Sequence, residues 1–166
     1  HAELFVSLPL QTTNGRIVPV NTFSSEILRK LYKDTRFHSM NSDQFLLSIL
    51  TYPEMWRYVP VLKIPNRNFG LYFGLTPGQC AYMELFESNG AYKLQEKLEE
   101  AYQKMPDKRT AFDKDLIKFD EKINIFHQLI NKQLIRLFPK TDDPDQKWYA
   151  PGDDLSVFTA RDSGII

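Results

Sequence analysis

The chain has 166 residues, is 42% hydrophobic, and carries 21 basic and 21 acidic residues, so its formal net charge is zero. This length predicts one domain, the apolar content suffices for a core, and the balanced charge lacks the basic excess typical of nucleic-acid binding. The single cysteine, Cys80, excludes an internal disulfide framework, a C-x-x-C redox pair and a thiolate zinc site.

The first predicted element is a β-hairpin over residues 4–20. The dipeptide Asn14-Gly15 separates "LFVSLPLQ" from "RIVPV", and both of its residues tolerate the positive φ angles that a type I′ turn requires. Pro9 and Pro19 cannot donate a backbone hydrogen bond, so each is expected where its missing N–H faces outward. The pattern therefore favours a small edge hairpin over a large sheet.

An amphipathic helix is predicted next, over about residues 23–34. Asn21 and Thr22 are expected to cap it, and Glu26 is placed in its first turn, where the helix dipole favours a negative charge. Arg16, directly after the turn, can reach back to loop carbonyls or to Glu26. The helix buries one apolar face, formed by Phe23, Ile27, Leu28 and Leu31.

The middle of the chain combines short elements. A helix over 42–52 is predicted to begin with a capping box between Asn41 and Gln44 and to bury Phe45, Leu46 and Ile49. The segment "VPVLKIP" at 59–65 indicates a short strand, and "NFGLYFGLTPG" indicates a glycine-containing aromatic loop whose rings are buried.

Two further helices are predicted before the longest one. Thr76-Pro77-Gly78-Gln79 is typical of a helix start, so a helix is expected to run to about Glu87 with Cys80 as a small buried residue within it. The next helix spans 91–105 and ends at Pro106. Its apolar stripe is Ala91, Leu94, Leu98, Ala101 and Met105.

The longest predicted helix covers "TAFDKDLIKFDEKINIFHQLINKQLIRLF", about 40 Å ending at Phe138-Pro139. Its stripe is Phe112, Leu116, Phe119, Ile123, Phe126, Ile130, Leu134 and Leu137. Residues 141–166 are predicted to be an irregular tail with one aromatic anchor, Trp148-Tyr149. The fold class is mainly α: a helical bundle with a long C-terminal helix and a small N-terminal β-hairpin, forming a single domain over 1–140.

Motifs for catalysis and metal binding are absent from the sequence. His1, His38, His127 and Cys80 are not at metal-ligand spacing, and there is no G-x-S-x-G, P-loop or dinucleotide-binding motif. No run approaches the roughly 18–20 apolar residues of a membrane helix. The chain opens with His1 rather than Met, so we expect a fragment or processed product that does not itself insert into a membrane.

The order of residues resembles the extracytoplasmic domain of cytochrome c biogenesis proteins of the CcsA/ResB type, especially the long fused forms of Bacteroidetes. In the opening segment the matching positions are His1-Ala2, Gly15-Arg16, Pro19, Asn21-Thr22, Glu26 and Leu28-Arg29. Later matches are Trp56, Val59-Pro60, "AFDKDLIKFDEKINI" at 111–125, residues 135–139 and Lys147-Trp148. The opening motif is fairly specific, whereas the helical matches are generic.

This resemblance implies a role in system II haem attachment at the periplasmic face of the inner membrane. The parent protein would be a membrane-anchored cytochrome c synthetase (haem lyase), with haem as its cofactor and apocytochrome c and its own membrane segments as partners. This chain lacks the family's tryptophan-rich loop, so it is expected to hold neither catalytic residues nor haem of its own. His1 is the one candidate for a haem-proximal residue, and the structural or partner residues are Arg16, Asn21, Thr22, Glu26, Arg29 and Trp56.

Two other classes of function stay open. The chain can be a general helical protein-interaction module that is unrelated to haem. It can also be a small hydrolase, which requires His38 or His127 within hydrogen-bond reach of a serine and an aspartate in a concave pocket.

Overall fold

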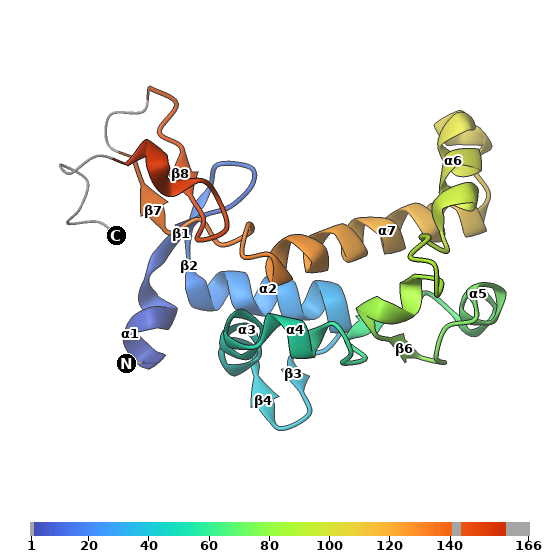
Figure 1. Cartoon of the computed structure of the whole chain (residues 1–166), viewed down its shortest axis with the longest axis horizontal. Coiled ribbons are helices and arrows are strands. Elements are labelled where there is room, and N and C mark those ends of the chain that lie inside the picture. Colours follow the sequence, from blue (N-terminus) through green and yellow to red (C-terminus); the bar gives the residue numbers. More distant parts are fainter. Residues whose placement is uncertain (1, 141–143, 159–166) are drawn as a thin grey trace. The chain divides into compact units, whose positions relative to one another are not determined.

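A computed structural model of the chain describes residues 2–140 and 144–158. The chain divides into two compact units. Unit 1 comprises residues 1–29, 34–51 and 127–166, and unit 2 comprises residues 30–33 and 52–126. Figure 1 shows their elements coloured along the sequence. The prediction of a single domain over 1–140 stays a prediction.

The described residues are mainly helical, which confirms the predicted fold class. The α-helices are α1 (Ala2–Ser7), α2 (Val20–Tyr32), α3 (Ser42–Thr51), α4 (Pro53–Trp56), α5 (Arg67–Phe73), α6 (Gln95–Gln103) and α7 (Ala111–Ile130). The 3₁₀ helices are η1 (Tyr82–Leu85), η2 (Pro106–Lys108) and η3 (Leu155–Val157). The strands are β1 (Pro9–Gln11), β2 (Ile17–Pro19), β3 (Arg36–Phe37), β4 (Met40–Asn41), β5 (Leu62–Lys63), β6 (Gln79–Cys80), β7 (Phe138–Pro139) and β8 (Trp148–Tyr149). Among the described residues they form antiparallel pairs of consecutive strands.

The N-terminal hairpin of unit 1 is confirmed but is shorter than predicted. Strands β1 and β2 pair in register from Pro9↔Pro19 to Gln11↔Ile17. The type I′ turn was wrong: of the dipeptide, only Gly15 has a positive φ, at 83°. The Gly15 N–H donates to the Thr12 carbonyl at 2.9 Å, as in a three-residue loop that ends in a left-handed residue.

Residues 2–7 form helix α1 rather than the predicted extension of the first strand. Strand β2 ends at Pro19 because α2 begins at the next residue. An extended segment before Pro9 would therefore have no strand to pair with, and its backbone groups are satisfied by local helical hydrogen bonds instead.

Helix α2 begins at Val20, three residues earlier than predicted. Asn21 and Thr22 are therefore inside its first turn rather than at its cap, and Glu26 lies beyond that turn. The reason is a tertiary contact, because the Val20 N–H donates a hydrogen bond to the Leu8 carbonyl at 2.9 Å. This bond satisfies an amide at the helix start that would otherwise need a capping side chain as its acceptor. The predicted apolar face is buried, as Phe23, Ile27, Leu28 and Leu31.

Helix α3 confirms its predicted capping box. The Asn41 N–H donates to Gln44 Oε1 at 3.0 Å, and the Gln44 N–H donates to Asn41 Oδ1 at 2.9 Å. These reciprocal bonds satisfy two amides within four residues of sequence, so the helix start needs no distant partner. The predicted core residues of α3 are all fully buried: Phe45, Leu46 and Ile49.

Helix α7 ends at Ile130, eight residues before the predicted end at Phe138. Its 20 residues span about 30 Å rather than 40 Å. After the helix, Lys132 adopts a positive φ of 58°, and the chain then pairs with other segments of unit 1 (Figure 1). The Gln11 N–H donates to the Arg136 carbonyl at 3.0 Å, and the Leu137 N–H donates to the Tyr149 carbonyl at 3.0 Å.

The predicted tail is more ordered than expected at its aromatic anchor. Trp148 and Tyr149 form strand β8, which pairs with β7, and η3 follows at Leu155–Val157. Residues 141–143 and 159–166 lie outside the described part of the chain. The anchor itself was therefore predicted, whereas its partner strand was assigned to the long helix.

In unit 2, the predicted aromatic loop is helix α5. Asn66 caps this helix by accepting the Phe69 N–H at 3.0 Å, and Gly74 ends it with a positive φ of 63°. Asparagine before a helix and glycine after it are the preferred residues at those positions. Phe69 and Phe73 are buried as predicted, whereas Tyr72 is exposed.

The α-helix predicted from Thr76 to about Glu87 does not form, and only the short 3₁₀ helix η1 (Tyr82–Leu85) lies in this range. Gln79 and Cys80 form β6 opposite β5 instead, with Gly78 at a positive φ of 87°. The Glu84 carboxylate accepts the Thr76 N–H at 2.9 Å and the Ala81 N–H at 2.8 Å. One carboxylate thus satisfies the donors of a loop that sequence alone assigned to a helix. Cys80 is fully buried, as predicted.

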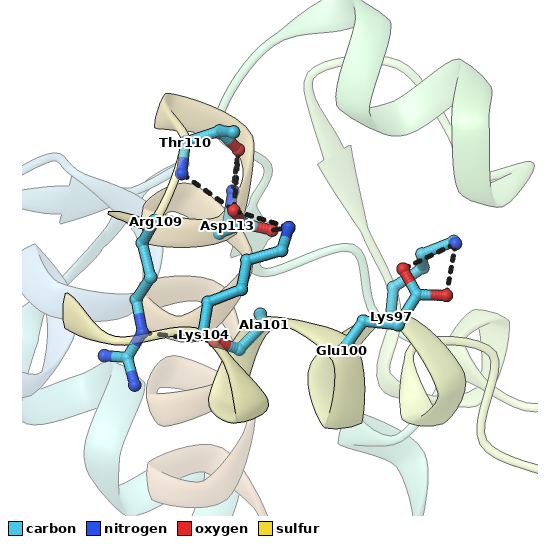
Figure 2. A network of polar contacts seen from close by, with 7 residues as sticks. All are labelled: Lys97, Glu100, Ala101, Lys104, Arg109, Thr110 and Asp113. Atoms are coloured by element: carbon cyan, nitrogen blue, oxygen red, sulfur yellow. Dashed lines mark hydrogen bonds and ion pairs between the residues drawn. The ribbon is translucent and has the colours of Figure 1, made fainter. Parts of the chain in front are cut away.

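Helix α6 is shorter than the predicted 91–105 and meets α7 through one polar network. Its stripe residues Leu94, Leu98 and Ala101 are buried, whereas Ala91 and Met105 are exposed. Figure 2 shows Lys104, just after α6, in an ion pair with Asp113 of α7; Nζ is 2.9 Å from Oδ1. Asp113 also accepts the Thr110 N–H at 2.7 Å and is 5% exposed.

This network predicts a specific acid sensitivity. The hydrogen bonds from Lys104 and then from Thr110 lower the pKa of Asp113 from its ordinary value of 3.8 to about 2. A depressed carboxyl pKa stabilises the fold above the ordinary value, and this contribution is lost as the pH falls from 3.8 to about 2. Asp113→Asn is therefore expected to unfold more easily than the wild type at pH 7, with a difference that shrinks below pH 4.

The measurement is the urea unfolding free energy between pH 2 and 7. Asp107→Asn is the matched control, since Asp107 lies on η2 and its side chain is 64% exposed. The control should follow the wild-type curve at every pH. If the unfolding free energies of the wild type and Asp113→Asn differ by the same amount at pH 2 and pH 7, the lowered pKa of Asp113 is contradicted.

Candidate functional site

Four of the residues singled out from the sequence line one polar groove in unit 1. They are Asn21, Thr22, Glu26 and Arg29, all on α2. The groove has a volume of about 380 Å³, and we call it the α2–α3 groove because the start of α3 completes it. Its lining residues are Asn21, Thr22, Ser25, Glu26, Arg29, Ser42 and Asp43.

Helical spacing explains why these α2 residues share a face. Thr22, Glu26 and Arg29 are separated by four and three residues, which places them above one another on a helix. The opposite face of α2 carries the buried core residues. The amphipathic pattern that buries one side of α2 therefore also presents the polar side to the groove.

A buried serine joins the two helices of the groove. Ser24 is fully buried, and its hydroxyl contacts the Asp43 carboxylate and lies 2.9 Å from the Asn21 carbonyl oxygen. Asp43 is in the first turn of α3, where the helix dipole favours a negative charge. The capping box of Asn41 and Gln44 orients this turn, so the position of Asp43 is set by local and tertiary bonds together.

The chemistry of the groove suits the binding of a polar ligand. Its side chains offer hydroxyls, an amide, two carboxylates and one guanidinium, which can donate to and accept from a polar or extended peptide. No histidine, cysteine or lysine lines the groove, and its ionisable groups are the carboxylates of Glu26 and Asp43 and the guanidinium of Arg29. The described structure has no ion pair between Glu26 and Arg29, and both side chains are exposed.

The other sequence-derived candidates lie elsewhere. Arg16 is exposed in the hairpin loop; its carbonyl accepts the Thr12 N–H at 2.8 Å, and among the described residues its side chain makes no bond to Glu26. Trp56 is in unit 2, at the end of α4, and is 2% exposed, so its ring is part of the core. His1 lies outside the described residues. The partner roles of all these residues stay predictions.

Four residues in or beside the α2–α3 groove were not predicted from the sequence: Ser24, Ser25, Ser42 and Asp43. Asp43 had one signal, its position just after a predicted capping residue, but nothing in its neighbourhood indicates that it meets α2. That contact joins residues 19 positions apart. It therefore depends on how α3 packs, which helical periodicity does not specify.

The histidines do not converge on this site. His38 packs edge-on against Phe37, with ring centroids 4.6 Å apart, and His127 Nε2 lies 3.1 Å from Asn131 Nδ2. In the described ranges, no three His, Cys, Asp or Glu side chains are grouped as a metal site would need. Over the same ranges no helix has the length and hydropathy to span a membrane.

Fold and groove together define a mainly α segment with a polar groove on its surface. No model of a known protein family matches the chain. The chain is similar to Protein NrfI of Wolinella succinogenes, with 34% identity over 145 residues. The match covers 87% of this chain and 16% of Protein NrfI, so the chain corresponds to a small part of the length of that relative.

Proposed function

We propose that this chain is a periplasmic segment of a membrane-anchored cytochrome c biogenesis protein that attaches haem by the system II route. The segment supports the haem-handling core of the parent protein and positions apocytochrome c or a partner subunit. Haem and the lyase activity belong to other parts of the parent protein. His1 is the residue of this segment that we place nearest to the haem.

The similarity to Protein NrfI carries this proposal. An identity of 34% over 87% of the chain supports a role in cytochrome c maturation and argues against an unrelated helical module. The CcsA/ResB type and the periplasmic side rest on the resemblance of the opening motif, from His1-Ala2 to Leu28-Arg29.

The α2–α3 groove supports the positioning role. Its hydroxyls and amide can bond the backbone of an extended peptide, while Arg29 and the carboxylates of Glu26 and Asp43 can pair with charged side chains. Such a surface holds a polypeptide without reacting with it. We therefore assign Arg29 and Glu26 to binding of the partner and leave bond formation to the membrane core.

The test uses the full parent gene, expressed with and without residues 1–166, together with a reporter cytochrome that carries a C-x-x-C-H site. Covalent haem on the reporter is measured by haem staining, and the amount of parent protein in the membrane by immunoblot. Deletion is expected to abolish haem attachment. Arg29→Ala is expected to lower it by roughly tenfold, as for the loss of one charge-assisted hydrogen bond.

Arg67→Ala is the matched control, because Arg67 is also an exposed helical arginine but lies on α5, outside the groove. It should leave haem attachment unchanged. Normal haem attachment after deletion, with the parent protein still present, would contradict the proposal and favour an interaction module unrelated to haem. Equal losses for Arg29→Ala and Arg67→Ala would contradict the role of the groove.

A further inference from the structure

Unit 2 contains a second cavity, which is rich in lysine and shares no residue with the α2–α3 groove. We call it the lysine pocket; its volume is about 300 Å³. It is lined by Lys30, Lys33, Pro65, Asp115, Lys118, Phe119, Glu121 and Lys122. Neither the sequence motifs nor the proposed function uses this cavity.

The unusual group in the pocket is Lys122 of α7. It is 8% exposed, and its Nζ donates a hydrogen bond to the carbonyl oxygen of Lys63. In residues 2–140 and 144–158, no carboxylate forms a hydrogen bond or an ion pair with it. A buried ammonium whose hydrogen-bond partner is a neutral carbonyl is costly, because that bond compensates only part of the desolvation of the charge.

The charges around Lys122 increase this cost. Burial and then the nearby Lys33 lower the pKa of Lys122 to about 8, so the group still carries a charge at neutral pH. The titratable groups that act on it from other elements are Lys33, Lys63 and Cys80. The pocket lining has four lysines and two carboxylates, which gives a net charge of +4 − 2 = +2.

The free hydrogen-bonding capacity of Lys122 indicates the kind of ligand. An ammonium has three N–H donors, and the Lys63 carbonyl accepts one of them. The remaining donors can bond the oxygens of a carboxylate. The Phe119 ring centroid lies 5.6 Å from the same nitrogen, and Pro65 adds a second apolar surface.

We propose that the lysine pocket binds the carboxylate of a small molecule whose apolar body lies against Phe119 and Pro65. The carboxylate pairs with the Lys122 ammonium, and Lys118 at the rim adds a weaker attraction. A site of this size holds a ligand on the scale of a substituted aromatic acid. The proposal goes beyond the maturation role and does not depend on it.

The experiment titrates the isotope-labelled 166-residue chain with sodium benzoate and follows the backbone amide signals by NMR. Benzoate is expected to shift amides around Lys63, Phe119 and Lys122, with a Kd on the order of 1 mM. Benzyl alcohol, which has the ring without the charge, should bind at least about tenfold more weakly. Inorganic phosphate, which has the charge without the ring, should also bind more weakly.

Three substitutions separate the ligand contact from a structural role. Lys122→Met keeps the volume and removes the charge, and should weaken benzoate binding by at least about tenfold. Lys118→Met should weaken it by roughly two- to fivefold, as for an exposed pair. Lys114→Met is the control, because Lys114 is exposed on α7 and does not line the pocket; its affinity should equal the wild type.

The pH profile identifies Lys122 as the group that binds. In the free protein its pKa is about 8, so the wild-type affinity for benzoate should fall as the pH rises from 7 to 9.5. Lys118→Met, which keeps the buried lysine and its packing, should show the same fall, and folded Lys122→Met should show none. Benzoate that shifts no pocket amide, or binds Lys118→Met and the wild type with a pH-independent Kd, would overturn the proposal.

Discussion

The Trp56→Ala variant is expected to lose about 3–5 kcal/mol of unfolding free energy, as for removal of a large aromatic side chain from a core. Trp56 ends α4 and is 2% exposed. Deleting its indole leaves a cavity that the surrounding side chains fill only in part. The measurement is chemical denaturation of the 166-residue chain, followed by circular dichroism.

Tyr58→Ala is the matched control for this prediction. Tyr58 lies two residues further along and is 69% exposed, so its removal should change stability by about 0.5 kcal/mol or less. The comparison distinguishes a structural role of Trp56 in the core from a role in binding a partner, the two roles that the sequence left open for this residue. A Trp56→Ala protein of wild-type stability that fails to support haem attachment would show a partner residue rather than a core residue.

The Gly152→Ala variant is expected to lose about 1–3 kcal/mol by overpacking. A Cβ atom at position 152 would lie 2.2 Å from the Asn131 carbonyl oxygen and 3.0 Å from the Lys132 carbonyl carbon. Both obstacles are backbone atoms, which cannot rotate away as a side chain can. The Gly152 N–H also donates to the Lys132 carbonyl at 3.0 Å, so relief of the clash would stretch this hydrogen bond.

The control is Gln133→Ala, an exposed position in the same turn whose hydrogen bond to Gln128 uses the backbone. Its unfolding free energy should lie within about 0.5 kcal/mol of the wild type. Thermal and urea unfolding of both variants provide the measurement. Equal stability of Gly152→Ala and the wild type would show that residues 131–132 and 152 do not approach each other this closely.

The Gly152 contact also explains why the end of α7 was misplaced. The apolar stripe continues at helical spacing to Leu134 and Leu137, and Leu134 is indeed buried. However, the backbone after Ile130 forms hydrogen bonds with the backbone of Gly152, Gln11 and Tyr149. The periodicity reports which side chains are buried, and a turn or a strand can bury the same residues as a helix.

In the candidate sites too, the sequence predicted what depends on one helix and missed what depends on packing between segments. Helical spacing alone placed Thr22, Glu26 and Arg29 on one face, because that arrangement depends on a single helix. Ser42 and Asp43 come from a second helix, and the lysine pocket draws residues from three segments of the chain. Residues that meet through packing leave no periodic signal in the sequence.

The sequence by itself determined the mainly α class, the hairpin at Gly15, the buried face of α2 and the capping box of α3. Each of these depends on interactions between residues close in the chain, where propensity and hydrogen-bond geometry act directly. Tertiary structure decided the start of α2 at Val20 and the end of α7. The Leu8 carbonyl accepts the Val20 N–H and so allows α2 to begin early. After Ile130, hydrogen bonds with Gly152, Gln11 and Tyr149 hold the backbone out of the helix. These bonds outweigh the local preference for helix only at the end of α7.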